Sequence, residues 1–127
     1  MTSIIKVDEI QNNAGTGPVT LANQLAAKAW VDFDGATNVI QGSSNIASLT
    51  DQGTGQYQFA FTNNMGNVNF AIAPSTGNRD SSNAGTGRLA QGGSGAVGNF
   101  HYELCNSTNQ TNEDAVAGYA VILGDLA

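Results

Sequence analysis

The stretch SSNIASLTDQGTGQYQFAFTNNMGNVNFAIA, residues 43–73, decides the fold class of this chain. Tyr57, Phe59 and Phe61 alternate with polar or small residues, and a period of two is typical of a strand with one buried face. The alternation returns over residues 68–72, after an Asn-rich turn. A glycine-rich turn precedes Tyr57, where glycine adopts positive φ without a clash of Cβ. The stretch therefore predicts three short β-strands joined by turns.

Other parts of the chain carry similar segments. The run 115–123 is almost continuously apolar, which is expected of a strand covered on both faces. Residues 77–98 are expected to be mostly loop, with a brief strand at 88–90, and residues 106–114 form another polar loop. The remaining strands are expected at residues 4–10, 27–35, 39–42, 46–50 and 100–105. Seven to nine short strands with frequent turns predict an all-β protein, an antiparallel β-sandwich or barrel.

Trp30 stands out in the segment 27–35. The alternation places it on the polar face of that strand, with Lys28, Asp32 and Asp34. Since a buried aromatic ring normally packs against other groups, either this face is partly covered or Trp30 contacts a neighbouring chain.

Composition narrows the class of protein. The chain has 127 residues, enough for one domain, and only 11% of them are charged, against about 25% in ordinary globular proteins. A polar but nearly uncharged surface suits β-rich extracellular and virion proteins, and also a chain buried in an assembly. The net charge is −6 and the four cations are scattered, so we expect no nucleic acid partner, because phosphate binding needs clustered Lys and Arg.

The given sequence shows neither a signal-peptide core nor a membrane-spanning run, and both bear on the expected location of the protein. The N-terminal MTSIIKVDEI has no apolar signal-peptide core, and no run approaches the ~18 apolar residues of a membrane span. We therefore expect synthesis in a cytoplasm and no insertion into a membrane; the chain could still leave the cell as part of a virus particle.

The first predicted strand lies apart from the others in sequence. We therefore divide the chain into an extended N-terminal arm, residues 1–26, and a β-sandwich domain, residues 27–127. An isolated strand needs a partner edge, and three identical chains can supply one by wrapping around a common axis. The expected trimer or partner contacts are Ile4, Ile5, Val7, Ile10 and Trp30.

Catalytic and metal-binding patterns are missing. One His and one Cys cannot build a zinc site within the chain, and neither a nucleophile elbow nor a phosphate-binding loop occurs. Asp32 and Asp34 point the same way on one strand and could hold Ca²⁺, but a solvated acidic face is the simpler interpretation. We expect no catalytic residue, no metal and no cofactor.

The polar loops and the aromatic residues near them suggest a sugar-binding surface. Aromatic rings stack on sugars, and Asn, Arg and Asp side chains form hydrogen bonds with sugar hydroxyls. Besides the Asn-rich loops, the candidates are Trp30, Arg79, Asp80, Tyr102 and Tyr119.

Three segments resemble one known family. WVDFDG at residues 30–35, SNIASLTDQGTGQYQFAFTNNM at 44–65 and NFAIA at 69–73 are similar to the β-domain of bacteriophage tail fibres, marine and cyanobacterial ones especially. The opening SIIKVDEIQNNAGTGPVTLAN, residues 3–23, resembles the fibre segment that commonly precedes this domain. The matches cover roughly the first 60% of the chain and end before the glycine-rich stretch.

The resemblance implies a homotrimeric, non-enzymatic virion protein, a tail fibre or a fibre-like protein. Its partners would be other phage structural proteins of the tail or capsid and a polysaccharide on the host surface. In this interpretation, loops at 63–67, 77–98 and 106–114 face the receptor. The receptor-facing residues would be Asn63, Asn64, Asn67, Arg79, Asp80, Asn83, Asn106 and Asn109.

Two other functions stay open at this point. A capsid decoration, or cement, protein would use the same trimer to clamp coat subunits through residues 1–22 and stabilise the head. A polysaccharide depolymerase would need two carboxylates about 5–10 Å apart in a groove, and nothing in the sequence places such a pair.

Overall fold

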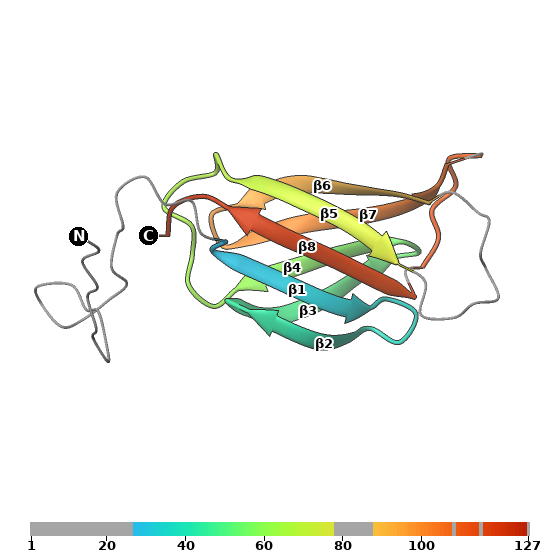
Figure 1. Ribbon diagram of the computed structural model, residues 1–127, viewed down its shortest axis with the longest axis horizontal. Helices are drawn as coiled ribbons and strands as arrows, with labels where there is room; N and C mark the ends of the chain where they lie inside the picture. Colours follow the sequence, from blue (N-terminus) through green and yellow to red (C-terminus); the bar gives the residue numbers. More distant parts are fainter. Residues whose placement is uncertain (1–26, 78–87, 108, 115, 127) are drawn as a thin grey trace, which may run out of the picture.

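The computed structural model describes residues 27–77, 88–107, 109–114 and 116–126. These residues form eight β-strands, and none of them is helical, so no helix that could cross a membrane occurs in this part of the chain (Figure 1). The strands are β1 (Ala29–Asp34), β2 (Val39–Ser44), β3 (Ile46–Gly53), β4 (Gln56–Phe61), β5 (Ala71–Gly77), β6 (Arg88–Ala96), β7 (Asn99–Asn106) and β8 (Ala117–Leu123).

The strands form two stacked sheets of four. Their orders are β2-β1-β8-β5 and β3-β4-β7-β6, and neighbouring strands pair antiparallel throughout. In Figure 1 the first sheet lies in front of the second. The prediction of an antiparallel β-sandwich is therefore confirmed. The expected strands at residues 4–10 and the arm lie outside the described residues.

The glycine-rich stretch before β7 differs from the prediction. A loop with a brief strand at 88–90 was expected, but β6 extends from Arg88 to Ala96 and pairs with β7 along its length. Gly and Ser have low β-propensity, so the local pattern does not predict a strand. The partner strand determines the structure here, because β7 supplies a full row of backbone hydrogen-bonding groups.

The expected strand at 68–72 is also shifted along the chain. β5 begins only at Ala71 and continues to Gly77 through Pro74. Proline cannot donate a backbone hydrogen bond, and β5 lies at the edge of its sheet, where this is tolerated.

Among the described residues, strand β8 is covered on only one face. Ala120 and Ile122 are buried, whereas Val121 and Leu123 are 40% and 36% exposed. The described residues therefore contradict the expectation of cover on both faces, because none of their strands packs on the outer side of the sheet β2-β1-β8-β5.

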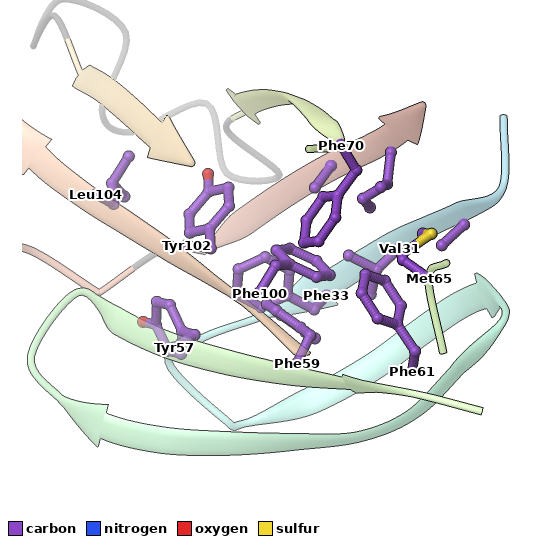
Figure 2. Close-up of a cluster of buried hydrophobic side chains, with 13 residues drawn as sticks. Val31, Phe33, Tyr57, Phe59, Phe61, Met65, Phe70, Phe100, Tyr102 and Leu104 are labelled. Carbon is purple, nitrogen blue, oxygen red and sulfur yellow. The ribbon is translucent and has the colours of Figure 1, made fainter. Parts of the chain in front are cut away.

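An aromatic cluster holds the two sheets together. Phe33 on β1 is fully buried and makes edge-to-face contacts with three rings of the opposite sheet (Figure 2). The ring centroids lie 5.0 Å from Tyr57, 4.9 Å from Phe59 and 5.0 Å from Tyr102. Such pairs stabilise by about 0.5–1.5 kcal/mol each beyond the burial of their area.

The backbone makes room for this ring. A Cβ atom at Gly118, on the neighbouring strand β8, would overlap the ring of Phe33. Further along the core, Phe100 stacks on Phe59 with centroids 5.1 Å apart and lies 5.5 Å from Phe61. The core therefore runs along the sandwich as a continuous row of rings.

One turn also requires glycine. Gly55, between β3 and β4, has a φ of 68°, and a Cβ there would lie 2.5 Å from the carbonyl oxygen of Leu104. Its N–H donates to Asp114 Oδ1 at 2.8 Å, and the hydroxyl of Tyr57 donates to the same oxygen at 3.2 Å. These contacts attach the segment after β7 to the β3–β4 turn.

Phe33→Leu should lower the free energy of unfolding by about 2–3 kcal/mol, because it removes three ring contacts and leaves a cavity. Urea denaturation at a fixed protein concentration measures this. Val68→Ala, at an exposed position, is the matched control and should change stability by less than about 0.5 kcal/mol. Equal losses in both variants would contradict the role assigned to Phe33.

Tyr102 makes the free energy of unfolding depend on pH in the alkaline range. Its hydroxyl donates to the carbonyl oxygen of Ser75 at 2.8 Å and so links β7 to β5 of the other sheet. Burial raises the pKa of this phenol well above its usual range. The unfolded chain ionises Tyr102 near pH 10 while the folded chain keeps it neutral, so the folded state is disfavoured as pH rises.

We therefore expect Tyr102 to contribute a loss of about 1.4 kcal/mol of stability per pH unit above roughly pH 10, and none below it. Tyr102→Phe should remove this contribution, while costing about 1 kcal/mol at neutral pH because Ser75 loses a donor. Unfolding measured from pH 7 to 11.5 tests both effects. An unchanged alkaline slope in the variant would refute the assignment.

Candidate functional site

The outer face of the sheet β3-β4-β7-β6 is polar and rich in amides. We call it the amide face. Alternation along the strands places these side chains outward, opposite the buried aromatic residues. Its central members are Gln56, Gln58, Gln91, His101 and Glu103.

Glu103 is the centre of this face. It pairs in register with Gln56 on β4 and with Gln91 on β6, so the three side chains form one row across three strands. The amide of Gln56 donates to Glu103 Oε1 at 3.0 Å. The amide of Asn112 donates to the same oxygen, also at 3.0 Å. The carboxylate is thus held in place by two amide donors.

Two clefts meet at Glu103. One, of about 350 Å³, lies towards the loop after β7, and the other, of about 320 Å³, lies along β4 and β7. The first is lined by Gln91, Glu103, Cys105, Asn106, Ser107, Gln110 and Asn112. The second is lined by Gln52, Gln56, Tyr57, His101, Tyr102 and Glu103. The shared carboxylate makes them two parts of one polar trough.

Residues of the loop after β7 form one wall of the trough, and hydrogen bonds of Asn106 hold this loop in place. The Asn106 side chain donates to Glu113 Oε1 at 2.9 Å, and its backbone N–H donates to Thr111 at 2.8 Å. The N–H of Gln110 donates back to the Asn106 carbonyl at 2.9 Å. Asn106 therefore shapes the wall as well as lining it.

The predicted receptor-facing residues do not gather in one place. Asn106 lines the trough, and Oδ1 of Asn109 accepts hydrogen bonds from the N–H and the hydroxyl of Thr111 within the same loop. The loop 63–67 lies at the opposite end of the sheet. β4 begins near the hydrogen bond from the Leu104 N–H to the Gly55 carbonyl and ends near the one from the Phe61 N–H to the Gly98 carbonyl, and the loop follows this second end.

At that opposite end, two hydrogen bonds of the Asn45 side chain hold the loop 63–67 in place. It accepts a bond from the Asn63 N–H at 2.7 Å and donates to the Asn63 carbonyl at 3.0 Å. Asn64 and Asn67 are exposed in the same loop. These three Asn residues could contact a receptor only at a second, separate point.

Several predicted residues lie outside the described residues. Of the receptor-facing set these are Arg79, Asp80 and Asn83. Of the partner-contact set these are Ile4, Ile5, Val7 and Ile10. Trp30 is described: it is 42% exposed on the outer face of the other sheet.

The expected sugar-stacking rings are not on the amide face. Tyr102 is 1% exposed and packs in the core, which corrects its assignment as a sugar-stacking residue. It alternates inward with Phe100 and Leu104, and the aromatic core needs its ring. Tyr119 is half-buried on β8, and like Trp30 it stands on the opposite side of the sandwich.

One of the two acidic residues of β1, Asp34, has a structural role in the turn that follows the strand. Asp34 Oδ1 accepts the N–H groups of Ala36 at 3.0 Å and Thr37 at 3.2 Å, which closes the turn to β2. In the described residues no three His, Cys, Asp or Glu side chains gather closely enough to hold a metal ion.

Sequence reasoning missed Glu103 and its amide neighbours. Their outward positions were visible in the alternation of β4 and β7. Their meeting in one row depends on the register of three strands, and register is set by tertiary pairing.

Comparison of the chain with family models, curated proteins and solved structures finds no match. The chemistry of the trough must therefore be judged from its own residues. A carboxylate and several neutral amides provide both acceptors and donors for hydroxyl groups, and such groups fix the orientation of a polar ligand.

Asn106→Ala should loosen the wall of the trough, because the loop loses its side-chain bond to Glu113. We expect amide exchange of Gln110 to become about tenfold faster, the equivalent of one hydrogen bond. The amide of Gly66, bonded to Asp125 at the other end of the sandwich, is the internal control. Equal acceleration at both amides would indicate global destabilisation instead.

Proposed function

We propose that this chain is a non-enzymatic bacteriophage virion protein, a homotrimeric tail fibre or fibre-like protein, that attaches to a polysaccharide on the host surface through the trough of the amide face. The observation that carries the proposal is the row Gln56–Glu103–Gln91 between two clefts. The sequence resemblance of residues 30–73 to fibre β-domains supports the viral context.

The composition of the trough supports a neutral or weakly charged sugar polymer as ligand. Of the residues that line it, amides predominate, and Glu103 is the one carboxylate. No Lys or Arg is among these lining residues, so an anionic polymer would lack a partner for its charges. Each cleft has a volume within the usual range of ligand pockets, about 300–1,000 Å³.

The same composition supports binding without hydrolysis. Glycoside hydrolysis uses two carboxyl groups about 5–10 Å apart on either side of the sugar bond. The described lining residues of the trough supply only Glu103. A depolymerase is therefore the least supported of the three functions considered.

A capsid decoration protein is the second candidate. The exposed apolar residues on the outer face of the sheet β2-β1-β8-β5 favour it, since a clamp on coat subunits needs an adhesive surface. The two functions predict different copy numbers in purified virions. Hundreds of copies on the capsid would exclude the function as a tail fibre, and a few copies at the tail would exclude the function as a capsid decoration protein.

Glu103→Gln should weaken polysaccharide binding at least tenfold, because it removes the charged acceptor, whose hydrogen bonds contribute about 1.5–3 kcal/mol. The probe is an array of surface polysaccharides purified from candidate host bacteria, with titration calorimetry on those bound. Gln91→Ala, on the same row, should also weaken binding.

Asp125→Asn is the matched control, because Asp125 is exposed, lies outside the residues that line both clefts, and loses the same charge. It should bind as the wild type does. Equal weakening in Asp125→Asn and Glu103→Gln would show that net charge matters rather than the trough. A wild-type protein that binds no polysaccharide on the array would refute the attachment function.

A further inference from the structure

Strand β6 contains three glycines, and packing inside the molecule explains two of them. A Cβ at Gly92 would lie 2.5 Å from Cγ2 of Ile72 on β5, so contact between the two sheets excludes a side chain there. Gly95 lies at the register shift near the end of β6, and a Cβ at this position would overlap Oδ1 of Asn99. Both positions therefore require glycine for the fold itself.

Gly93 is different, because the fold leaves room for a side chain at this position. A Cβ there would point to the amide face, and its nearest described neighbour would be Cβ of His101 at 3.8 Å, an ordinary contact distance. Gly93 has no positive φ, and its pairing with His101 lies within the regular part of the register. Among the described residues, neither steric exclusion nor backbone conformation requires glycine here.

The position of Gly93 suits contact with a ligand. A glycine inside a strand packs no side chain and costs backbone entropy, and it often marks a place where a ligand approaches the backbone closely. Gly93 is exposed, follows Gln91 on the outward side of β6 and pairs with His101. Gln91 lines the first cleft and His101 lines the second. Gly93 therefore lies beside both parts of the trough.

Glu103 offers a hydrogen-bond acceptor at the same place. Its two hydrogen bonds, from Gln56 and Asn112, both go to Oε1, and a carboxylate oxygen accepts about two such bonds. Oε2 has no partner among the described residues, where the one buried side-chain oxygen or nitrogen without a partner is Asn99 Oδ1. Solvent therefore reaches Glu103 Oε2, and this oxygen can accept from a hydroxyl group of a ligand.

Gln91 stands beside this acceptor. It is the in-register neighbour of Glu103 on β6, it is exposed, and its side chain makes no hydrogen bond with the described residues. The Cβ atoms of such neighbours lie about 4.5–5.5 Å apart, so the amide and the carboxylate can converge on hydroxyls of adjacent ring carbons. The amide both donates and accepts, whereas the carboxylate only accepts. The two side chains together suit a sugar with two adjacent free hydroxyls.

We propose that a sugar ring of the bound polysaccharide lies on the backbone at Gly93, beside His101. Two adjacent hydroxyls of this ring bind Glu103 Oε2 and the Gln91 amide. This inference rests on the proposed attachment function, and it identifies a subsite of the trough and the sugar chemistry that the subsite takes. The missing side chain at Gly93 leaves the space that the ring occupies.

Gly93→Ala and Gly93→Val test the floor of this subsite. Both add a side chain where the fold has room, so the urea midpoint of unfolding should stay the same or rise, since alanine and valine cost less backbone entropy than glycine. Polysaccharide binding should fall about threefold in Gly93→Ala and about tenfold or more in Gly93→Val, because the added methyl groups occupy the place of the ring. The probe is the array of surface polysaccharides purified from candidate host bacteria.

Ser48→Val is the matched control. Ser48 is exposed on β3 of the same face, pairs with Ala60 and lies outside the residues that line both clefts. This variant adds a valine to the amide face away from the subsite, and it should bind as the wild type does. Equal weakening in Ser48→Val and Gly93→Val would overturn the subsite.

A second measurement tests the adjacent hydroxyls. Each polysaccharide is spotted untreated and after periodate oxidation, which cleaves the carbon–carbon bond between two adjacent free hydroxyls and turns both carbons into aldehydes. Borohydride then reduces the aldehydes to alcohols, so the ring is opened without added charge. Wild-type binding should be about tenfold weaker or more on the oxidised spots. Binding by Glu103→Gln should depend much less on oxidation, because this variant has already lost the charged acceptor.

The outcomes separate the subsite from the attachment function. Wild-type binding that survives oxidation, or Gly93→Val that binds as tightly as the wild type, would overturn the subsite and leave attachment standing. If Gly93→Val lowers the urea midpoint, Gly93→Ala decides, and unchanged binding in that variant would overturn the subsite. A wild type that binds no untreated spot would overturn both.

Discussion

The insertion of Phe33 among Tyr57, Phe59 and Tyr102 is the constraint on which the sandwich depends. One ring from β1 contacts three rings of the other sheet, and the glycine at position 118 leaves the space it needs. These contacts fix the relative position of the two sheets, because aromatic rings packed edge to face tolerate little displacement. The Tyr102 hydroxyl adds a directional bond from β7 to β5, so that burial and hydrogen bonding support the same arrangement.

Packing of the inner faces also decides what each outer face displays. Since side chains alternate along a strand, burial of Tyr57 and Tyr102 turns Gln56 and Glu103 outward on one side of the molecule. Burial of Phe33 and Ile122 turns Trp30 and Val121 outward on the other. The domain consequently has two chemically different surfaces, one of amides around a carboxylate and one on which exposed apolar side chains stand beside Asp32 and Asp34.

Local patterns predicted the aromatic strands well and the glycine-rich strand poorly. The alternation at 57–61 and 29–33 marks β4 and β1 because each has a fully buried face. β6 was expected to be a loop, since its Gly and Ser residues have low strand propensity and only pairing with β7 orders them. The apolar run of β8 predicted cover on both faces, and the described residues cover one of them. Asn106 was identified as a candidate from its loop, but its anchoring bond to Glu113 was not.

The sequence by itself determined the fold class, the one buried face of each aromatic strand and the low charge of the surface. These properties depend on residue type and on a period of two, which are local. Only the tertiary structure decided the strand order, and with it the row Gln56–Glu103–Gln91, the two clefts and the pairing of Trp30 with Val121. Cross-strand neighbours are set by register between segments far apart in the chain, and a one-residue slip would turn every side chain of a strand to the opposite face.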